Sequence, residues 1–222
     1  MKIDKRLLVC ADMVKGDFVC DIGTDHGYLP AYLIESGKCR RAIAADINKM
    51  PLDSAIATFE RAGITDKAQF ILSDGLKDVP LDEVTDIVIA GMGGELISQI
   101  IAADERSKQC GANFILQPMT RAGVLRKFLA ENGFEVMEER AVSDGKFVYS
   151  VIMCRYTGAV RCIGRTEENI GLVDSSYEDG KKYILRQLQR LESAANGISS
   201  QNEPLAQEYK KLIAQIRKET GL

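Results

Sequence analysis

The sequence predicts an α/β protein in which a mostly parallel sheet is followed by a pair of helices. Between residues 18 and about 118, short β-rich apolar runs alternate with helical patterns, which is typical of βα units in a parallel sheet. Residues 134–141 and 146–154, joined by Ser-Asp-Gly, indicate an antiparallel hairpin at the end of the sheet. After Tyr156 no strand pattern follows.

The elements of the sheet region alternate regularly along the chain. We expect strands at 18–22, 42–46, 69–72, 85–90 and 113–117. We expect helices at 28–37, 51–62, 94–103 and 120–132. The last helix has a stop signal in Asn132-Gly133, because glycine readily adopts the left-handed conformation that ends a helix. This alternation predicts a Rossmann-like sheet, and the hairpin makes its final strand antiparallel.

The last part of the chain is predicted to be a separate helical unit, so we expect two domains, 1–158 and 159–222. A glycine-containing linker, TGAVRCIGR, opens the second. Apolar side chains then recur at three-, four- and seven-residue spacing in two segments. In the first they are Ile170, Val173, Tyr177, Ile184, Leu188 and Leu191, and in the second Leu205, Tyr209, Leu212 and Ile216. Asn196-Gly197 and Glu203-Pro204 bracket the turn of the predicted helical hairpin, which has a coiled-coil seam.

Composition and charge exclude several classes of protein. The net charge of −3 argues against general adhesion to nucleic acid but permits a local basic surface. The six cysteines form no C-x-x-C pair and His26 is the only histidine, so we expect neither a metal site nor a disulfide framework. No apolar run approaches the roughly 18 residues of a membrane helix, and the first residues do not resemble a signal peptide. We expect a cytoplasmic protein without membrane contact; the sequence does not decide the oligomeric state, and we favour a monomer.

A nucleoside-containing cofactor is indicated by residues 20–30, CDIGTDHGYLP. Here a strand ends, Gly23 opens a turn and a helix begins. Asp46 follows about twenty residues later, at the end of the next strand. A carboxylate at that position accepts hydrogen bonds from both ribose hydroxyls. NAD and S-adenosylmethionine share this device, so Asp46 does not choose between them.

Asp25 favours S-adenosylmethionine as the cofactor. A carboxylate in the middle of the loop would repel the pyrophosphate of a dinucleotide, whereas S-adenosylmethionine has an ammonium and a sulfonium group and no phosphate. Asp74, after the third strand, is placed to accept a hydrogen bond from an adenine amino group. The predicted cofactor-binding residues are Asp21, Gly23, Asp25, His26, Asp46, Ile47, Asp74, Gly75, Gly91 and Met92.

Several of these residues also have a simpler interpretation. Asp21 and Asp25 are suited to cap the following helix, and Asp46 with Asn48 to form an ordinary helix-capping loop. His26 in such a loop more often makes a backbone hydrogen bond than acts as a base, so we assign it no catalytic role.

The segment AGMGGEL, residues 90–96, follows the fourth strand. Many enzymes that methylate an exocyclic amino group have a D/N-P-P-Y/F sequence at this place. The glycines here have no side chain to hold such a group, but they let a flat ring approach the backbone, and Met92 supplies a polarizable wall. The alternative is a tight turn with Met92 in the core.

Several motifs together resemble a known family. DIGTDHGYLP, SDGL, VIAGMGGELI and ILQPM, with Arg6-Leu7 upstream and a helical hairpin at the end, are similar to those of the bacterial tRNA adenine(22)-N1 methyltransferases, the TrmK family. The resemblance covers residues 1 to about 155 closely and the tail more loosely. It implies transfer of a methyl group from S-adenosylmethionine to N1 of an adenine in the D-arm of tRNA. The sequence departs from the family pattern at Met119, where a polar asparagine is common.

The chemistry of this transfer suggests roles for further residues. N1-methyladenine is cationic when first formed, and Asp25 is the predicted catalytic residue, since its carboxylate would stabilise that charge or relay a proton. The predicted substrate-binding residues are Arg6, Gly93, Gly94, Gln117, Pro118, Lys181, Lys182, Arg186 and Arg190. Further candidates for RNA contact are Lys2, Lys5, Arg121 and Arg126. Each basic residue suits a solvated surface equally well, but the row from Lys181 to Arg190 is typical of an arm that binds the tRNA backbone.

Two other functions are compatible with the sequence. One is an S-adenosylmethionine-dependent methyltransferase for a small molecule, whose tail only dimerises the protein. The other is a non-catalytic RNA-binding or coiled-coil adaptor. The complete acid series and the glycine-rich loops argue against the adaptor, whereas the acidic net charge gives the small-molecule enzyme some weight.

Overall fold

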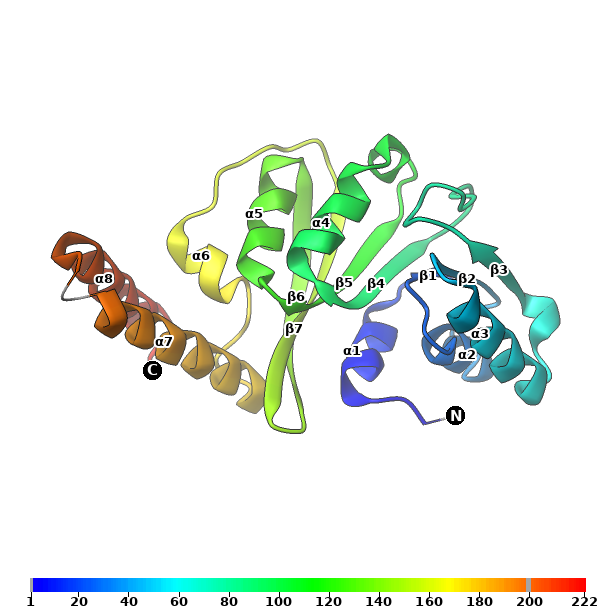
Figure 1. Ribbon diagram of the computed structural model, residues 1–222, viewed down its shortest axis with the longest axis horizontal. Coiled ribbons are helices and arrows are strands. Elements are labelled where there is room, and N and C mark those ends of the chain that lie inside the picture. Colours follow the sequence, from blue (N-terminus) through cyan, green and yellow to red (C-terminus); the bar gives the residue numbers. More distant parts are fainter. Residues whose placement is uncertain (1, 199–200) are drawn as a thin grey trace.

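The protein is built on a seven-stranded sheet with the strand order β3-β2-β1-β4-β5-β7-β6 (Figure 1). The computed structural model describes residues 2–198 and 201–222. Five strands run parallel: β1 (Phe18–Ile22), β2 (Arg41–Asp46), β3 (Ala68–Leu72), β4 (Asp86–Gly93) and β5 (Asn113–Thr120). β7 (Phe147–Tyr156) is antiparallel to both β5 and β6 (Phe134–Asp144). The predicted mostly parallel sheet with a terminal antiparallel hairpin is confirmed.

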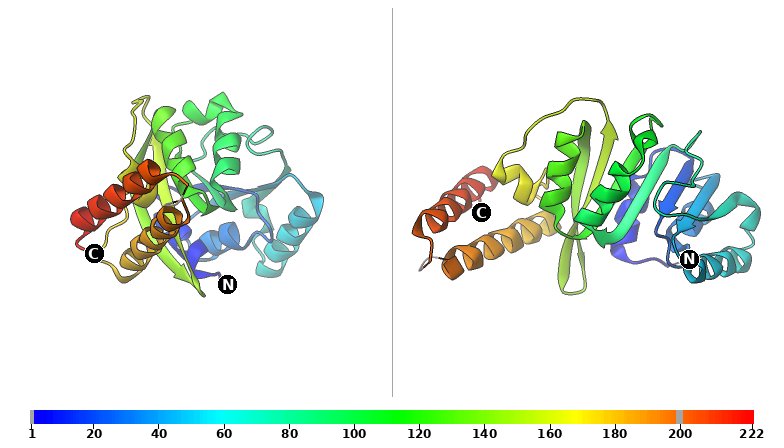
Figure 2. Two further views of the ribbon diagram at one scale, coloured as in Figure 1. Left: turned by 60° about the vertical axis from the view of Figure 1, so that its left-hand side comes forward. Right: turned by 45° about the horizontal axis from the view of Figure 1, so that its top comes forward.

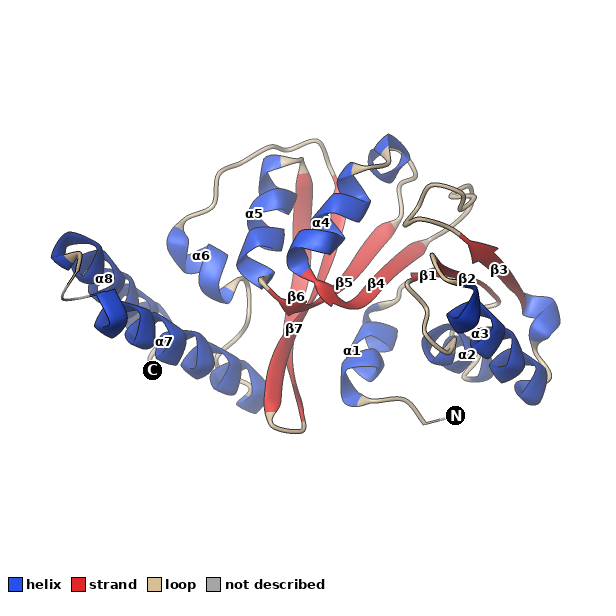
Figure 3. Cartoon of the chain, viewed as in Figure 1, coloured by secondary structure: helices blue, strands red, loops and turns tan. Residues whose placement is uncertain are grey.

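Helices cover both faces of this sheet (Figure 3). They are α1 (Lys5–Met13), α2 (Tyr28–Glu35) and α3 (Lys49–Ala62) on one face, and α4 (Gly94–Ala102) and α5 (Ala122–Glu131) on the other. All but α1 match predicted helices to within a few residues. The short helix α1 is fixed at its start by Asp4, whose side chain accepts a hydrogen bond from the backbone N–H of Leu7 at 2.9 Å.

The strands alternate their side chains between two apolar cores. In β4, Ile87 and Ile89 pack with α4 and α5, whereas Val88 packs with α1 to α3. Strands buried on both faces appear in the sequence as continuous apolar runs, which is why they were recognisable. Because helices occupy both faces, the carboxyl edge of the parallel strands is where a ligand has access to the sheet.

The tail consists of three helices, α6 (Arg165–Ile170), α7 (Glu178–Ile198) and α8 (Glu203–Thr220). Figure 2 shows α7 and α8 as the predicted helical hairpin. The first predicted segment is wrong in one respect, because it breaks at Gly171, which has a φ of 61°. Tyr177 therefore precedes α7 and is 71% exposed instead of lying in the seam. The expected turn signal Asn196-Gly197 lies inside α7.

Arg126 ties the tail to the sheet. Its guanidinium forms a buried ion pair with Glu139 of β6 at 2.7 Å and donates to the hydroxyl of Tyr183 on α7, also at 2.7 Å. It also donates to the backbone carbonyl of Glu168 on α6. The prediction that Arg126 contacts RNA is wrong, because its side chain is enclosed by these partners.

A membrane-spanning helix and a cluster of metal-ligating side chains are both recognisable in a structure. Across residues 2–198 and 201–222, no helix has both the length and the apolar character needed to span a bilayer. The same residues contain no group of three or more metal-ligating side chains.

Candidate cofactor and substrate site

Three of the predicted acids lie in a row at the carboxyl edge of the sheet. Asp21 is near the end of β1, Asp46 is the last residue of β2, and Asp74 follows β3 by two residues. The three strands are parallel neighbours, and Asp46 lies in register with Leu72 at the end of β3. The structure thus brings together carboxylates that are far apart in the sequence.

Asp21 is the buried member of this row. Desolvation by burial, with a smaller contribution from the negative charge of Asp46, raises the pKa of its carboxyl to about 6. A positively charged ligand at this edge would favour the ionised carboxylate and so lower its pKa. The alternative that Asp21 or Asp25 caps α2 is wrong, because the residue at the N-cap position is Gly27.

Asp46 holds its own loop as well as facing the edge. Its Oδ1 atom accepts a hydrogen bond from the backbone N–H of Asn48 at 2.7 Å, as the loop-forming alternative expects. Beside it, the side chains of Ile47 and Leu72 are exposed although they are large and apolar. Exposed aliphatic groups next to carboxylates suit a ligand that combines a flat ring with hydroxyl groups.

Gly23 and Met92 bring the two predicted glycine loops into contact. Gly23 has a φ of 77°, and a Cβ atom added there would lie 2.0 Å from the Cε atom of Met92. Only glycine at position 23 permits this approach. Met92 also packs against the core below it. It therefore contacts the first glycine loop and also lies partly in the core, as the tight-turn alternative expects.

Asp25 and His26 are exposed residues of the first loop. The Asp25 side chain is 81% exposed, and its Oδ2 atom lies 3.4 Å from Nε2 of His26. The ring of His26 stacks on that of Tyr28, with the ring centroids 5.1 Å apart. The structure therefore gives His26 a side-chain and ring partner at the start of α2.

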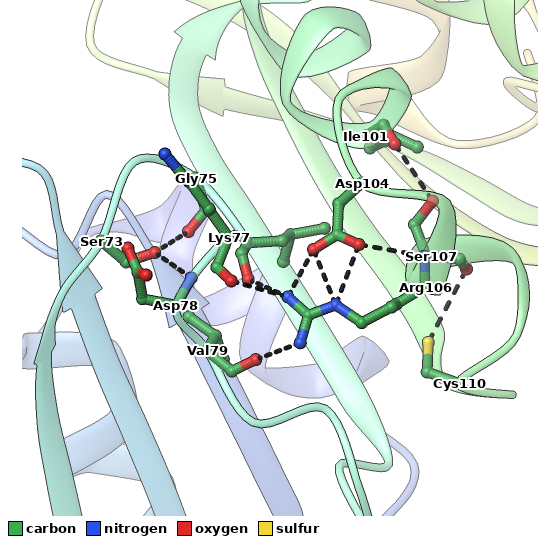
Figure 4. Close-up of polar contacts among 11 residues, drawn as sticks. Ser73, Gly75, Lys77, Asp78, Val79, Ile101, Asp104, Arg106, Ser107 and Cys110 are labelled. Carbon is green, nitrogen blue, oxygen red and sulfur yellow. Dashed lines mark hydrogen bonds and ion pairs between the residues drawn. The ribbon is translucent and has the colours of Figure 1, made fainter.

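Arg106 holds the loop that follows β3. Its guanidinium donates to the backbone carbonyls of Leu76 at 2.7 Å, Lys77 at 3.0 Å and Val79 at 3.1 Å. Figure 4 shows Arg106 facing Lys77 and Val79 of this loop. Asp104 pairs with the same guanidinium. Arg106 was missed in the sequence because nothing in its local pattern reveals partners about thirty residues away.

The same loop is also tied within itself. The hydroxyl of Ser73 donates to the carbonyl of Gly75 at 2.9 Å and accepts from the N–H of Asp78 at 3.1 Å (Figure 4). Gly75 has a φ of 63°, which favours glycine. Asp74 therefore sits on a fixed loop.

Gln117 joins three segments beneath the second glycine loop. Its Oε1 atom accepts from the Arg6 guanidinium at 2.8 Å and from the N–H of Gly91 at 3.1 Å. Its Nε2 atom donates to the carbonyl of Pro118 at 3.1 Å. The Gln117 side chain is wholly buried, so the structure supports a positioning role for it rather than the predicted direct contact with the substrate.

Arg6 is likewise committed to partners within the chain. It pairs with Asp4 at 2.7 Å and with Asp144, at the end of β6, at 3.5 Å. Its side chain is 18% exposed. Asp144 was missed because its proximity to Arg6 depends on the fold of the hairpin.

The two glycines that begin α4 differ in their surroundings. Gly94 is buried, and a Cβ atom there would lie 2.4 Å from the backbone oxygen of Arg121. Packing alone requires glycine at this position, and its predicted substrate contact is not supported. At Gly93 a Cβ atom would lie 3.4 Å from the Thr120 hydroxyl, so the site is less confined.

A groove of about 850 Å³ continues the carboxyl edge toward the tail. It lies between the end of β5, the tip of the β6–β7 hairpin and one side of α7. We call it the basic groove, because six basic residues line it: Arg121, Arg126, Lys146, Lys182, Arg186 and Arg190, of which Arg126 is engaged in its buried ion pair. Pro118 lines it as well, while the predicted Lys181 does not.

Charges in the basic groove are partly paired. Arg121 lies 3.3 Å from Glu95, and Lys182 lies 3.0 Å from Glu178. Both pairs are exposed, so solvent screens them and they leave the cations available to a strong anion. Glu168 is an acidic member of the lining. The groove thus has a net positive character within an acidic protein.

The fold and site define a Rossmann-like α/β protein that has a ligand edge lined by acids and glycine loops, with the last strand antiparallel. The chain belongs to the methyltransferase-domain family, whose model matches residues 3–152. It is 32% identical, over 154 residues, to the tRNA (adenine(22)-N(1))-methyltransferase of Bacillus subtilis. That alignment covers 69% of this chain and 65% of the relative, which is slightly less than two thirds of the relative's length.

Solved structures extend the likeness over the tail. A protein in the NADB-Rossmann superfamily from Streptococcus agalactiae superimposes with a TM-score of 0.85 and 30% identity, covering 97% of both chains. A putative tRNA (m1A22) methyltransferase of Streptococcus pneumoniae, solved in complex with S-adenosyl-L-methionine, gives a TM-score of 0.82 and 27% identity. This second likeness covers 97% of this chain and 99% of the other.

Proposed function

We propose that the protein transfers a methyl group from S-adenosylmethionine to N1 of an adenine in the D-arm of tRNA, at the position numbered 22. The observation that carries this proposal is that one sheet edge holds both features: the acid row ends β1 to β3, and the second glycine loop pairs with Pro118 and Thr120 of β5, which line the basic groove. The activity for which the Bacillus subtilis relative is named supports the choice of nucleoside and position.

The acid row fits S-adenosylmethionine. Asp46 would accept from the ribose hydroxyls and Asp74 from the adenine amino group, while Ile47 and Leu72 supply apolar surface for the ring. Burial raises the pKa of the Asp21 carboxyl, and the ammonium or sulfonium group of a bound cofactor would favour its ionised form. When bound, this cofactor supplies an already activated methyl group.

The protein's contribution to the transfer is then mainly alignment. Neutral adenine has a lone pair on N1 and no proton there to remove, so the reaction needs N1 to be held in line with the S–CH3 bond. The loop from Gly91 to Gly93 presents backbone to the target ring, and Gln117 fixes that loop through Gly91. We assign Asp25 to stabilising the cationic product or the methionine moiety.

The basic groove is the proposed tRNA-binding surface. N1 belongs to the pairing edge of adenine, so the base must be unpaired or rotated out before it reaches the site. Arg186 and Arg190 on α7, with Arg121 beside the end of β5, would bind phosphates along the groove. A tRNA substrate places the reaction in the cytoplasm.

Nucleoside analysis tests this function. An unmodified tRNA transcript is incubated with the protein and S-adenosylmethionine, digested to nucleosides and analysed by mass spectrometry. We expect 1-methyladenosine, and none from a matched transcript with guanine in place of adenine 22. Absence of 1-methyladenosine with the first transcript, while S-adenosylmethionine binds, would favour the small-molecule enzyme or the adaptor.

A further inference from the structure

We propose that Phe147 and Tyr149 form a stacking surface for the unpaired nucleotides next to the target adenine, with the Arg6 guanidinium packed against Tyr149 as its support. We call these two residues the stacking surface. The inference rests on the proposed function, because it assumes an RNA substrate, and it adds a contact to bases where the basic groove supplies contacts to phosphates.

Phe147 is an exposed aromatic residue at the tip of the β6–β7 hairpin. It follows the turn residues Gly145 and Lys146, lines the basic groove and is 51% exposed. In Figure 1 the tip of this hairpin extends beyond the rest of the sheet, close to the start of α7. Ser143 fixes the tip there through Asp179, whose carboxylate accepts from its hydroxyl at 2.6 Å. The apolar core of the tail uses the next residue, Val148, and not Phe147.

A chain of flat groups leads from Phe147 to the second glycine loop. The ring centroid of Phe147 lies 6.1 Å from that of Tyr149, and the Arg6 guanidinium carbon lies 5.8 Å from the Tyr149 centroid. Arg6 in turn donates to Gln117, which accepts from Gly91. Two aromatic rings therefore line the groove on the side of the hairpin, and Arg6 links Tyr149 to the loop proposed to receive adenine.

Such a surface suits unpaired RNA. When adenine is rotated out to expose N1, its neighbours lose a stacking partner, and aromatic rings or arginine planes replace that partner in single-strand recognition. Lys146, whose Nζ atom lies 5.3 Å from the Phe147 centroid, adds positive charge for the phosphates beside those bases. The combination of one exposed and one half-buried ring with cations in one groove indicates a single-stranded nucleotide as the occupant.

The test compares Phe147→Leu, which keeps an apolar side chain without a ring, with Phe147→Trp, which keeps a ring. Tyr177→Leu is the matched control, because Tyr177 is also exposed but does not line the basic groove. Affinity for an unmodified tRNA transcript is measured with S-adenosylhomocysteine present, at several salt concentrations. Cofactor affinity and melting temperature are measured on the same samples.

Phe147→Leu should weaken tRNA binding by about 5- to 150-fold, the range expected for loss of one base–aromatic stack. The slope of affinity against salt should not change, because no phosphate contact is lost. Phe147→Trp should bind like the wild type, and a fully paired RNA duplex should not distinguish the variants. If Phe147→Leu, folded and binding cofactor, weakens tRNA binding no more than Tyr177→Leu does, the inference is overturned. Failure of the wild-type protein to form 1-methyladenosine would instead overturn the proposed function.

Discussion

The Oε1 atom of Gln117 accepts a hydrogen bond from Arg6 at 2.8 Å and so joins the first helix to the end of the fifth strand. Because the same oxygen accepts from the N–H of Gly91, a side chain near the N-terminus fixes the backbone that is proposed to face the target ring. Alignment of that loop depends on a residue that need not touch the substrate.

Replacement of Arg6 by lysine should therefore slow methyl transfer more than it weakens cofactor binding. A single ammonium group cannot contact Gln117, Asp4 and Asp144 in the geometry of a planar guanidinium. We expect kcat to fall by about 10- to 100-fold, since small misplacements cost that much in transfer reactions. Arg40→Lys is the matched control, because Arg40 is an exposed arginine that pairs with Asp17. Steady-state kinetics with wild-type kcat for Arg6→Lys would contradict the positioning role.

Asp46→Asn should weaken S-adenosylmethionine binding without unfolding the protein. The amide retains an oxygen for the N–H of Asn48, but it loses the charged acceptor for the ribose hydroxyls, worth about 1.5–3 kcal/mol. Asp53→Asn, an exposed change on α3, is the control. Calorimetric titration should show weaker S-adenosylmethionine binding for Asp46→Asn and wild-type binding for Asp53→Asn. Equal affinities of the two variants would refute the assignment of Asp46 to the ribose.

Arg106→Gln should weaken cofactor binding through the loop that carries Asp74. Its guanidinium holds three carbonyls of that loop, and glutamine reaches fewer of them. The side chain is about half exposed, so we expect a small loss of stability and a several-fold higher KM for S-adenosylmethionine with kcat nearly unchanged. Arg61→Gln serves as the control, since its contacts lie within α3. A drop in kcat alone would show that Arg106 acts elsewhere.

The buried carboxyl of Asp21 should make the free energy of unfolding of the ligand-free protein depend on pH. Its folded pKa of about 6 lies above the ordinary value of 3.8, so the folded state binds more protons than the unfolded state between these pH values. This residue's contribution to stability is therefore lost as pH rises through that window. Asp21→Asn should raise the free energy of unfolding at pH 7 by roughly 1–3 kcal/mol and flatten its pH profile. The measurement is denaturant titration at pH 4 and pH 7. An equal effect of Asp21→Asn on the free energy of unfolding at both pH values would contradict the prediction.

Three cations of α7 should contribute to the salt dependence of tRNA binding. Combined replacement of Lys182, Arg186 and Arg190 by glutamine should reduce the log–log slope by roughly 0.9 for each lost phosphate contact in duplex-like RNA. In the control, glutamine replaces Lys210, Lys211 and Lys218 of α8. This triple replacement changes the net charge by the same amount, and the three lysines do not line the basic groove. Equal slopes in the two triple variants would reject the groove as the tRNA surface.

Substitution is a cleaner test of the tail than truncation near residue 160. Removal of the tail would expose Ala141 and Val148 of the hairpin, which pack against its core. It would also leave Arg126 without Tyr183 and its backbone partners on α6, and Glu139 without the N–H of Leu172. Loss of partners around a buried ion pair is strongly destabilising, so truncation confuses folding with RNA binding.

The local pattern of apolar residues was sufficient to predict the strands and most of the helices. Strand β1 begins and ends at the predicted residues because its apolar run is bounded by Gly16-Asp17 and Gly23. The acid row was also predictable, since parallel neighbours align their carboxyl ends. Helix α1 was missed because it is short and its stability comes largely from packing on the sheet.

Residues whose role depends on distant partners were not predictable. The sequence around Arg126 suits an exposed basic helix, yet Glu139 and Tyr183 enclose it. Arg106 and Asp144 lie near the site only because the fold returns them to it. A ligand-binding role for Phe147 can be inferred only from the folded chain, in which α7 forms the opposite wall of the basic groove.

Primer extension on methylated tRNA tests the central claim most directly, because a methyl group on N1 blocks the pairing edge of adenine and stops reverse transcriptase. The transcript is incubated with the protein, with and without S-adenosylmethionine, and then copied. A stop immediately before adenine 22 that requires both protein and cofactor is the predicted result. Incorporation of methyl groups without that stop, or a stop at another nucleotide, would contradict the proposed function.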